Sequence, residues 1–412
     1  MPGPGSPYNR MGCCKRLWIC FLFQGTKASM RICGTVFYEE GKMILMKKTI
    51  LCFLTAACVL MSCLCLSSCG KKEAESASSA SSGASTSAAA GSDGQSPQAS
   101  SPAGTQAGTI NPLTGRSDLP SEAVGQRPVG IMINNLEAAT PQHNIASADV
   151  CYEMQAEGGI TRILALYSDW RNLSMTGSIR SARPYFVELA QSHDCIYVHV
   201  GGSQDALDAI QSSKVDSING VSDSVTIWRD PGRKKSMGSV HSCVTDGEKL
   251  IQCVQKREIR TQAKSDGTAF SFRAEGDSQA PQGQSCKTLT VPFSSYVTSR
   301  FVYDSQKAVY AKYQFDKGQM DAATGKQVEV ENVLVLRTAI TPTGDSLGHV
   351  DIQLKGGEGI YASMGQCQDI RWSMESASDP IQLTDSSGQE LSLNPGKTWI
   401  CIVGQKDDVT AE

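Results

Sequence analysis

The chain has 412 residues, 40% of them hydrophobic, and a formal net charge of −3 at pH 7. This length and composition allow two domains of ordinary size with buried cores. The nearly balanced charge argues against a dedicated nucleic-acid-binding protein, because such proteins are strongly basic.

Residues 46–69 have the order of a bacterial lipoprotein signal peptide. Two lysines precede an apolar run too short for a secure membrane span, and the segment ends in Leu66-Ser67-Ser68-Cys69. Small residues before a cysteine are typical of the lipobox, in which the cysteine sulfur takes diacylglycerol. We therefore expect Cys69 to be lipidated and to anchor the protein at the outer face of the cytoplasmic membrane. Other cysteines in the apolar run leave a second processing site open.

Residues 1–45 fit no targeting pattern. The codons for Glu39-Glu40-Gly41-Lys42 are rich in purines, as a ribosome-binding site just before Met46 would be. We interpret Met46 as the translation start. The alternative is a genuine N-terminal extension with an apolar segment near Trp18.

Residues 70–108 consist mostly of Ser, Ala, Gly, Thr and Gln. Such a composition cannot bury a core and predicts a disordered linker. As a flexible coil it would span roughly 35 Å, which is enough to hold a folded part near a membrane without fixing its orientation.

Residues 109–260 predict an α/β or α+β domain, because apolar runs of strand length alternate with helix-start signals. One signal is the capping box formed by Thr245 and Glu248. The expected strands are residues 127–135, 149–154, 161–167 and 195–200, and the other expected helices are residues 181–192 and 204–211.

After a weakly patterned connection at residues 261–284, residues 285–405 predict a β-rich domain. Its apolar segments are short, rich in β-branched and aromatic residues, and separated by Gly, Asp, Ser or Pro. The expected strands are residues 288–292, 300–304, 308–315, 332–337, 349–354, 359–363, 368–373 and 398–403.

The cysteines and histidines indicate neither a metal site nor a complete set of disulfides. Nine of the sixteen cysteines lie at or before Cys69, and the remaining seven contain no C-x-x-C pair. No histidine pair has zinc-binding spacing, and no phosphate-binding glycine motif occurs. We therefore predict no metal and no cofactor, and interpret these seven as small buried hydrophobic residues. They are Cys151, Cys195, Cys243, Cys253, Cys286, Cys367 and Cys401.

Arg180 and Arg183 are the strongest candidates for ligand binding. They flank Ser181, an expected N-cap, and precede Pro184, which suits the first turn of a helix. Two guanidinium groups beside a helix N-terminus favour a carboxylate or phosphate ligand. The alternative is that one or both arginines pair with an acidic side chain of the same domain.

Two glycine turns accompany this pair. Glu157 precedes Gly158-Gly159 between two expected strands, and Gly201-Gly202 leads from a strand into a helix. Both turns are also common as plain connections, but the second resembles the strand-to-helix turns that line ligand crevices. The ligand-binding hypothesis includes Asn135, Glu157, Gly201 and Gly202 with the two arginines.

The basic run Arg233-Lys234-Lys235 predicts a solvated loop, with anionic lipid headgroups or wall polymers as an alternative contact. His241 follows it. Glu157 and His241 form a weak acid/base hypothesis for an envelope hydrolase or transferase, since no nucleophile motif is present.

Several motifs occur together and in order, among them Asn111-Pro112-Leu113-Thr114-Gly115, Ala156 to Arg162, Arg180 to Phe186 and His199 to Ser203. They resemble the YerB-like bacterial lipoproteins, a family of unknown function. The resemblance extends to the end of the β-rich part. It implies separate N- and C-terminal domains and a lipid anchor, but no activity or cofactor. The chain departs from it at His241-Ser242-Cys243, where members carry His-Asn followed by an aromatic residue.

Our leading hypothesis is a lipid-anchored, extracytoplasmic binding protein, with a wall polymer, peptide or envelope protein as partner and no nucleic acid. A non-catalytic structural scaffold is the third alternative. The sequence does not reveal a reaction, and an enzyme is the less favoured interpretation.

Overall fold

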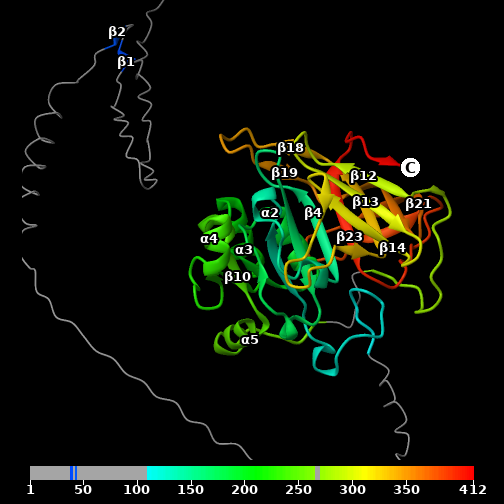
Figure 1. The fold of residues 1–412 in the computed structure, drawn as a ribbon, viewed down its shortest axis with the longest axis horizontal. Coiled ribbons are helices and arrows are strands. Elements are labelled where there is room, and N and C mark those ends of the chain that lie inside the picture. The colour runs from blue at the N-terminus through cyan, green and yellow to red at the C-terminus, as the bar shows by residue number, and fades with distance from the viewer. Residues whose placement is uncertain (1–37, 40–41, 44–108, 265–269) are drawn as a thin grey trace, which may run out of the picture. The chain divides into compact units, whose positions relative to one another are not determined.

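The computed structural model describes residues 109–264 and 270–412, together with two short strands, β1 (Tyr38–Glu39) and β2 (Lys42–Met43), which pair antiparallel. The expected linker and the segment around Cys69 lie outside the described residues. Residues 109–264 and 270–412 belong to one compact unit (Figure 1). Within the described ranges, no helix has the length and apolar character needed to cross a membrane.

An eleven-stranded sheet forms the centre of this unit and uses strands from both halves of the sequence. β4 and β23 pair in parallel, with Cys151 opposite Trp399, and so join the N-terminal α/β part to the β-rich C-terminal part. Both expected parts are present, and hydrogen bonds connect them without a break. The strand order is β11 (Gln284–Ser285), β21 (Gln366–Ser373), β20 (Gly356–Ser363), β17 (Asn332–Thr338), β23 (Thr398–Gly404), β4 (Val150–Gln155), β5 (Thr161–Tyr167), β3 (Val129–Asn134), β7 (Ile196–His199) and β8 (Ser217–Asn219), with β22 (Gln382–Asp385) beside β21.

Seven strands of this sheet point the same way, which brings their C-terminal ends to one edge. One of them is β21, because β20 runs antiparallel between it and β17. β17, β23 and β4 are parallel, as are β3, β7 and β8, and β5 runs antiparallel between β4 and β3. From β3 the chain leads first to β4 and β5 on one side and then to β7 and β8 on the other. The connection therefore changes direction beside β3, and open α/β sheets bind ligands at such points.

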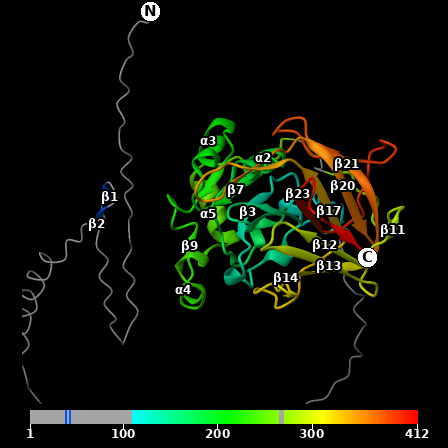
Figure 2. The same ribbon diagram turned by 90° about the horizontal axis from the view of Figure 1, so that it is seen from above.

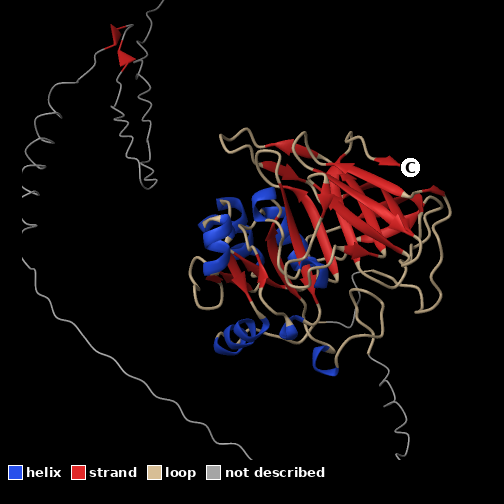
Figure 3. Cartoon of the chain, viewed as in Figure 1, coloured by secondary structure: helices blue, strands red, loops and turns tan. Residues whose placement is uncertain are grey.

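Both faces of the large sheet are covered, which explains why its central strands are apolar along their length. β3 and β5 are buried at every residue. Tyr185 and Leu189 of α2 pack on one face, whereas Leu250 of α5 packs on the other. The helices gather at one end of the unit (Figures 1 and 3). They are α2 (Pro184–Ser192), α3 (Gln204–Ser213), α4 (Pro231–Met237) and α5 (Gly247–Lys256), with 3-10 turns η1 (Ser121–Ala123), η2 (Glu137–Ala139), η3 (Ile145–Ser147), η4 (Trp170–Asn172) and η5 (Ser239–His241).

A six-stranded antiparallel sheet packs near β17 and β23 (Figure 2), where Phe301 contacts the same core as Trp399 and Cys401. It contains β15 (Lys317–Gly318), β14 (Val309–Gln314), β13 (Thr298–Asp304), β12 (Thr288–Pro292), β24 (Thr410–Ala411) and β16 (Glu329–Val330). Two smaller sheets complete the described fold: β6 (Thr176–Gly177) with β10 (Cys243–Thr245) and β9 (Trp228–Arg229), and β18 (Ile340–Pro342) with β19 (Val350–Ile352).

A buried ion pair connects the two larger sheets. Lys312 of β14 lies 3.3 Å from the Glu153 carboxylate of β4, and both side chains are fully buried. The Lys312 ammonium also donates to Ser299 Oγ, Gln314 Oε1 and Gln319 Oε1. A lysine this deep in a protein is stable only when its charge is paired and hydrogen-bonded.

Three sequence predictions about helices are wrong, two on where a helix begins and one on a segment expected to be a loop. Helix α2 begins at Pro184 with Arg183, not Ser181, at the N-cap, because a residue before proline avoids the helical region and Arg183 is extended (φ −135°). The N-cap of α5 is Asp246, whose carboxylate accepts from Lys249 N, whereas Thr245 belongs to β10.

The third concerns the basic run, which forms helix α4 and not a loop. Asp230 caps this helix by accepting from Arg233 N, and Pro231 occupies its first turn. Lys234 and Lys235 remain exposed on α4, whereas Arg233 is buried and donates to the carbonyl oxygens of Pro141 and Ala139.

Candidate functional site

Residues 178–183 cross the C-terminal edge of the large sheet beside β3, where the chain connection changes direction. Arg180 N donates to Met132 O of β3, and Val200 N, just after β7, donates to Arg180 O. Farther along, Ala182 N donates to Gly201 O. The segment is thus held between β3 and β7, and it presents Arg180 and Arg183 at the edge where α/β sheets bind ligands.

Glu157 binds two arginines, one with each carboxylate oxygen. Its Oε2 lies 2.5 Å from Arg183 Nη2, and its Oε1 pairs with Nη2 of Arg162, the second residue of β5. Both guanidinium groups are nearly buried, with 7% and 2% of the side chain exposed. Arg183 therefore forms an ion pair with an acidic side chain of the same domain, which was the alternative to ligand binding in the sequence analysis.

Arg180 differs from its two neighbours because it has no carboxylate within 4.0 Å in the part of the chain that the structure describes. It is half-buried, and its Nη1 makes only a 3.5 Å contact with Val240 O. Burial lowers its pKa; Glu157 raises it and the nearby Arg183 charge lowers it further. Arg162, Arg180 and Arg183 are termed here the arginine cluster, in which Glu157 pairs with Arg162 and Arg183.

Burial also lowers the pKa of Arg162 to about 10, and the neighbouring charge of Arg183 adds to this effect. Crowded guanidinium groups repel one another, and the repulsion is strong where water is excluded. An additional anion at the cluster would relieve it.

Three buried polar atoms near the cluster have no hydrogen-bond partner among the described residues: Arg183 Nε, Tyr197 OH and His199 Nε2. The Tyr197 and His199 rings stack with centroids 5.1 Å apart, and the charges of Arg162 and Arg183 act on the Tyr197 hydroxyl. Buried polar groups are rarely left unpaired, and such groups point to a binding role or to strain.

The protonation of His199 follows from its contacts. Its Nδ1 lies 2.7 Å from the carbonyl oxygen of Gly201, which can only accept, so Nδ1 carries the hydrogen. Burial lowers the pKa of His199, which favours the neutral ring. The Nε2 atom, which has no partner among the described residues, is therefore an unpaired acceptor.

Gly201 and Gly202 support the arginine segment. Gly201 has a positive φ of 67°, which suits glycine, and its N–H donates to Oδ1 of Asn219, the last residue of β8. Gly202 bridges Ala182. The two glycines thus contribute backbone that positions Arg180 and Arg183.

Asn135 lies away from the arginine cluster. Its side chain is fully buried, and its amide donates to Glu153 Oε1 and Thr161 Oγ1. Its oxygen accepts from Gln142 Nε2. These bonds belong to the network around the Glu153–Lys312 pair and leave Asn135 no donor for a ligand.

His241 lies beside the cluster, as shown by the charges that act on it. Burial lowers its pKa, and the Arg180 and Arg233 charges lower it further. Its Nδ1 is 2.8 Å from Asn134 Nδ2. Glu157 is a poor partner for acid/base chemistry with His241, because guanidinium groups occupy both of its oxygens.

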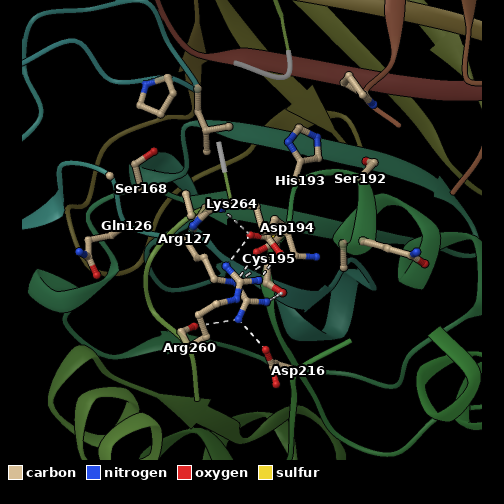
Figure 4. A pocket seen from close by; sticks show the side chains of 18 of the residues that line it. Gln126, Arg127, Ser168, Ser192, His193, Asp194, Cys195, Asp216, Arg260 and Lys264 are labelled. Atoms are coloured by element: carbon tan, nitrogen blue, oxygen red, sulfur yellow. Dashed lines mark hydrogen bonds and ion pairs between the residues drawn. The ribbon is translucent and has the colours of Figure 1, made fainter. Parts of the chain in front are cut away.

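A cavity of about 600 Å³ lies at the opposite edge of the sheet, and neither Arg180 nor Arg183 lines it (Figure 4). Asp194 is at its centre and pairs with Arg260 Nη2 at 2.6 Å, while Arg127 pairs with Asp216 at 2.5 Å. The sequence analysis did not select these residues for a site. Their charges satisfy one another, so the cavity offers a ligand fewer free charges than the arginine cluster does.

Metal ligands are not gathered at either edge: among the residues described, no group of three or more His, Cys, Asp or Glu side chains could hold an ion.

Comparison with known proteins gives a consistent result. Residues 113–260 match the N-terminal domain, and residues 289–400 the C-terminal domain, of a family described as protein of unknown function DUF3048. Lipoprotein YerB of Bacillus subtilis (strain 168) is 28% identical over 302 residues, which cover 72% of this chain and 86% of that protein. The crystal structure of the Bacillus subtilis YerB protein matches with a TM-score of 0.63 and 26% identity, covering 73% of this chain and 99% of that one.

Proposed function

Because the chain belongs to the family of YerB-like lipoproteins with DUF3048 N- and C-terminal domains, we propose that it is a lipid-anchored envelope protein that binds an anionic group at the arginine cluster. The observation that carries the proposal is Arg180, a half-buried guanidinium without a carboxylate partner among the described residues. It lies beside two further arginines that share one glutamate. The ligand chemistry is a phosphate or carboxylate, since both match the planar guanidinium fork.

The surroundings of Arg180 support a ligand that is larger than a free ion. Val240, whose carbonyl Arg180 contacts, is 54% exposed, and Val221, next to Gly201, is 72% exposed. Lys234 and Lys235 of α4 add exposed positive charge five to seven residues before Val240 and His241 in sequence. Exposed apolar and basic side chains around a half-buried arginine favour an anionic polymer or peptide of the envelope.

The membrane anchor is part of the proposal. Its support is the lipobox pattern at Cys69 and the similarity to a lipoprotein. Changing Cys69 to Ala should move the protein from the membrane fraction to the soluble fraction, and the wild-type N-terminal peptide should carry a diacylglycerol mass. An unmodified, membrane-bound wild type would refute this anchor.

Binding is tested with the detergent-solubilised full chain and two probes, a polyglycerol phosphate and a polyglutamate, which separate phosphate from carboxylate recognition. Arg180→Gln should weaken binding of the preferred probe by about 10- to 100-fold, because a hydrogen bond to a charged group contributes about 1.5–3 kcal/mol. Arg183 is unsuitable for this test, since its loss would disturb the buried ion pair with Glu157.

Arg300→Gln is the matched control, because Arg300 is an exposed arginine on β13 of the other sheet. It should bind like the wild type. Equal affinity of wild type and Arg180→Gln for both probes, or no binding of either probe at low salt, would overturn the proposal and leave a structural scaffold as the better interpretation.

A further inference from the structure

Cys286 and Cys367 lie together where the edge strand β11 pairs with β21. The register places Gln284 opposite Cys367, and Cys286 N donates to Gly365 O at 2.8 Å. The side chains are buried, at 0% and 3% exposure, in the same apolar cluster. Each thiol acts on the pKa of the other, so the two side chains are close neighbours. Two of the seven described cysteines are thus brought side by side from positions 81 residues apart.

The backbone on each side holds this contact in place. A Cβ on Gly283 would lie only 1.9 Å from Cys367 O, so the chain before Cys286 presses directly on β21 and only glycine fits there. On the other side, Tyr310 of β14 donates its hydroxyl hydrogen to Cys286 O at 2.8 Å. The backbone around both cysteines is therefore held in place by contacts from both sheets.

Cys367 also borders a cavity of about 910 Å³, which Gln282, Gln284, Arg273 and Asp369 help to line. A small molecule or a flexible peptide that enters this cavity meets Cys367, which is 3% exposed. The other buried cysteines with a raised pKa, such as Cys151 and Cys401, lie deep in the centre of the large sheet.

The cavity gives the two cysteines different roles. Cys367 borders it, whereas Cys286 is not among its lining residues. The neighbouring Cys286 thiol lowers the pKa of Cys367, which favours the thiolate that attacks in disulfide exchange. Cys367 is thus the attacking group and Cys286 the resolving group.

We propose that Cys286 and Cys367 are a redox-sensitive pair that closes to a disulfide and fastens β11 to β21. The oxidant is a disulfide of a small thiol or of a thiol oxidoreductase. The Cys367 thiolate attacks one oxidant sulfur and releases the other as a thiolate. Cys286 then loses its proton to solvent and displaces the second half, so that two protein thiols become one disulfide and the oxidant disulfide becomes two thiols.

The test uses the purified, fully reduced full chain, incubated under native conditions with oxidised glutathione. After acid quenching, free thiols are alkylated in denaturant and the peptides are mapped by mass spectrometry. We expect one linked peptide pair containing Cys286 and Cys367, lighter by two hydrogen atoms than the reduced pair, and the loss of two alkylated thiols. Cys151 and Cys401 on the adjacent strands β4 and β23 are the matched internal control and should remain alkylated.

The variants separate the two roles. Cys286→Ser should accumulate Cys367 as a mixed disulfide with glutathione, whereas Cys367→Ser should leave Cys286 largely unmodified. The wild-type peptide map decides the matter even if a variant does not fold. Recovery of both Cys286 and Cys367 as free thiols after equilibration, or oxidation of Cys151 and Cys401 at the same rate, would overturn the proposal.

Discussion

Replacing Lys312 by Met tests whether the buried ion pair between the two sheets stabilises the fold. The change keeps most of the side-chain volume but removes the ammonium group, which lies 3.3 Å from Glu153 and 4.5 Å from the centre of the Trp399 ring. It leaves the Glu153 charge buried without its cation. Ser299 would keep its donor bond to Glu153 Oε2, but Gln314 and Gln319 would lose a hydrogen bond each.

The expected cost follows from these contacts. Breaking a buried ion pair by removing one partner typically costs about 3–5 kcal/mol. Glu153 retains hydrogen bonds from Asn135, Thr161, Ser299 and Trp399, which offset part of the loss. The two glutamine oxygens left without a donor act in the opposite direction at about 1 kcal/mol or more each. We therefore expect a loss of about 4 kcal/mol.

Urea unfolding of the reduced protein, followed by tryptophan fluorescence, measures this loss. With an m-value of about 3 kcal/mol/M, the midpoint should fall by more than about 1 M. Combining Glu153→Gln with Lys312→Met should recover at least about 1 kcal/mol, because the unpaired charge is then absent. Lys317→Met, which removes an exposed pair with Glu137, should change stability by less than about 0.5 kcal/mol. A loss below about 1 kcal/mol for Lys312→Met, or a double variant less stable than the single one, would refute this reasoning.

Three further predictions concern pH and packing. Burial raises the pKa of Asp149 to about 6, so the stability that its protonated form contributes is fully present below pH 3.8 and is lost as the pH rises through about 6. Denaturation curves at each pH should show that Asp149→Asn loses less stability than the wild type between pH 4 and pH 7, by up to about 3 kcal/mol. Burial lowers the pKa of His193 to about 4, so the stability that its neutral form contributes is present above pH 6.5 and is lost as the pH falls through about 4. His193→Gln should reduce the loss of unfolding free energy between pH 6.5 and pH 4 by about 2–3 kcal/mol. An unchanged loss of stability in this pH range would show that His193 becomes charged in the folded state as easily as in the unfolded state. Gly247→Ala should cost about 1–3 kcal/mol in thermal unfolding, because a Cβ there would lie 2.1 Å from Arg171 O, whereas Gly232→Ala, with only an Asp230 oxygen at 3.2 Å, should have little effect.

Much of the secondary structure could be predicted because burial leaves a direct pattern in the sequence. β5 and β12 have the predicted bounds, and the other expected strands differ by a few residues at their ends. The elements that were missed, such as β6 and β9, are two residues long and have no periodicity of their own. Helix α4 was missed because its residues are mostly polar and its signal is a cap, Asp230 before Pro231.

The candidate site was predictable only in part. The sequence led to Arg180, Arg183, Glu157 and the Gly201 turn, which the fold brings to one edge of the sheet. The sequence offered Arg162 only as a residue that flanks the Gly158-Gly159 turn together with Glu157. The tertiary structure alone shows that Glu157 binds Arg162 and Arg183 at once. Asn135 was included because it ends a strand, but the pleat turns its side chain to the other face of the sheet.

The sequence by itself determined the longer apolar strands and helices, where a lipid anchor is expected and which residues concentrate positive charge, because these depend on local composition and spacing. The tertiary structure alone decided that β4 pairs with β23, that Glu157 neutralises Arg183 but leaves Arg180 without a carboxylate, and that Cys286 meets Cys367. The physical reason is that these contacts join residues up to about 250 positions apart. Their register is set by the packing of two sheets and several helices at once, and no local pattern encodes it.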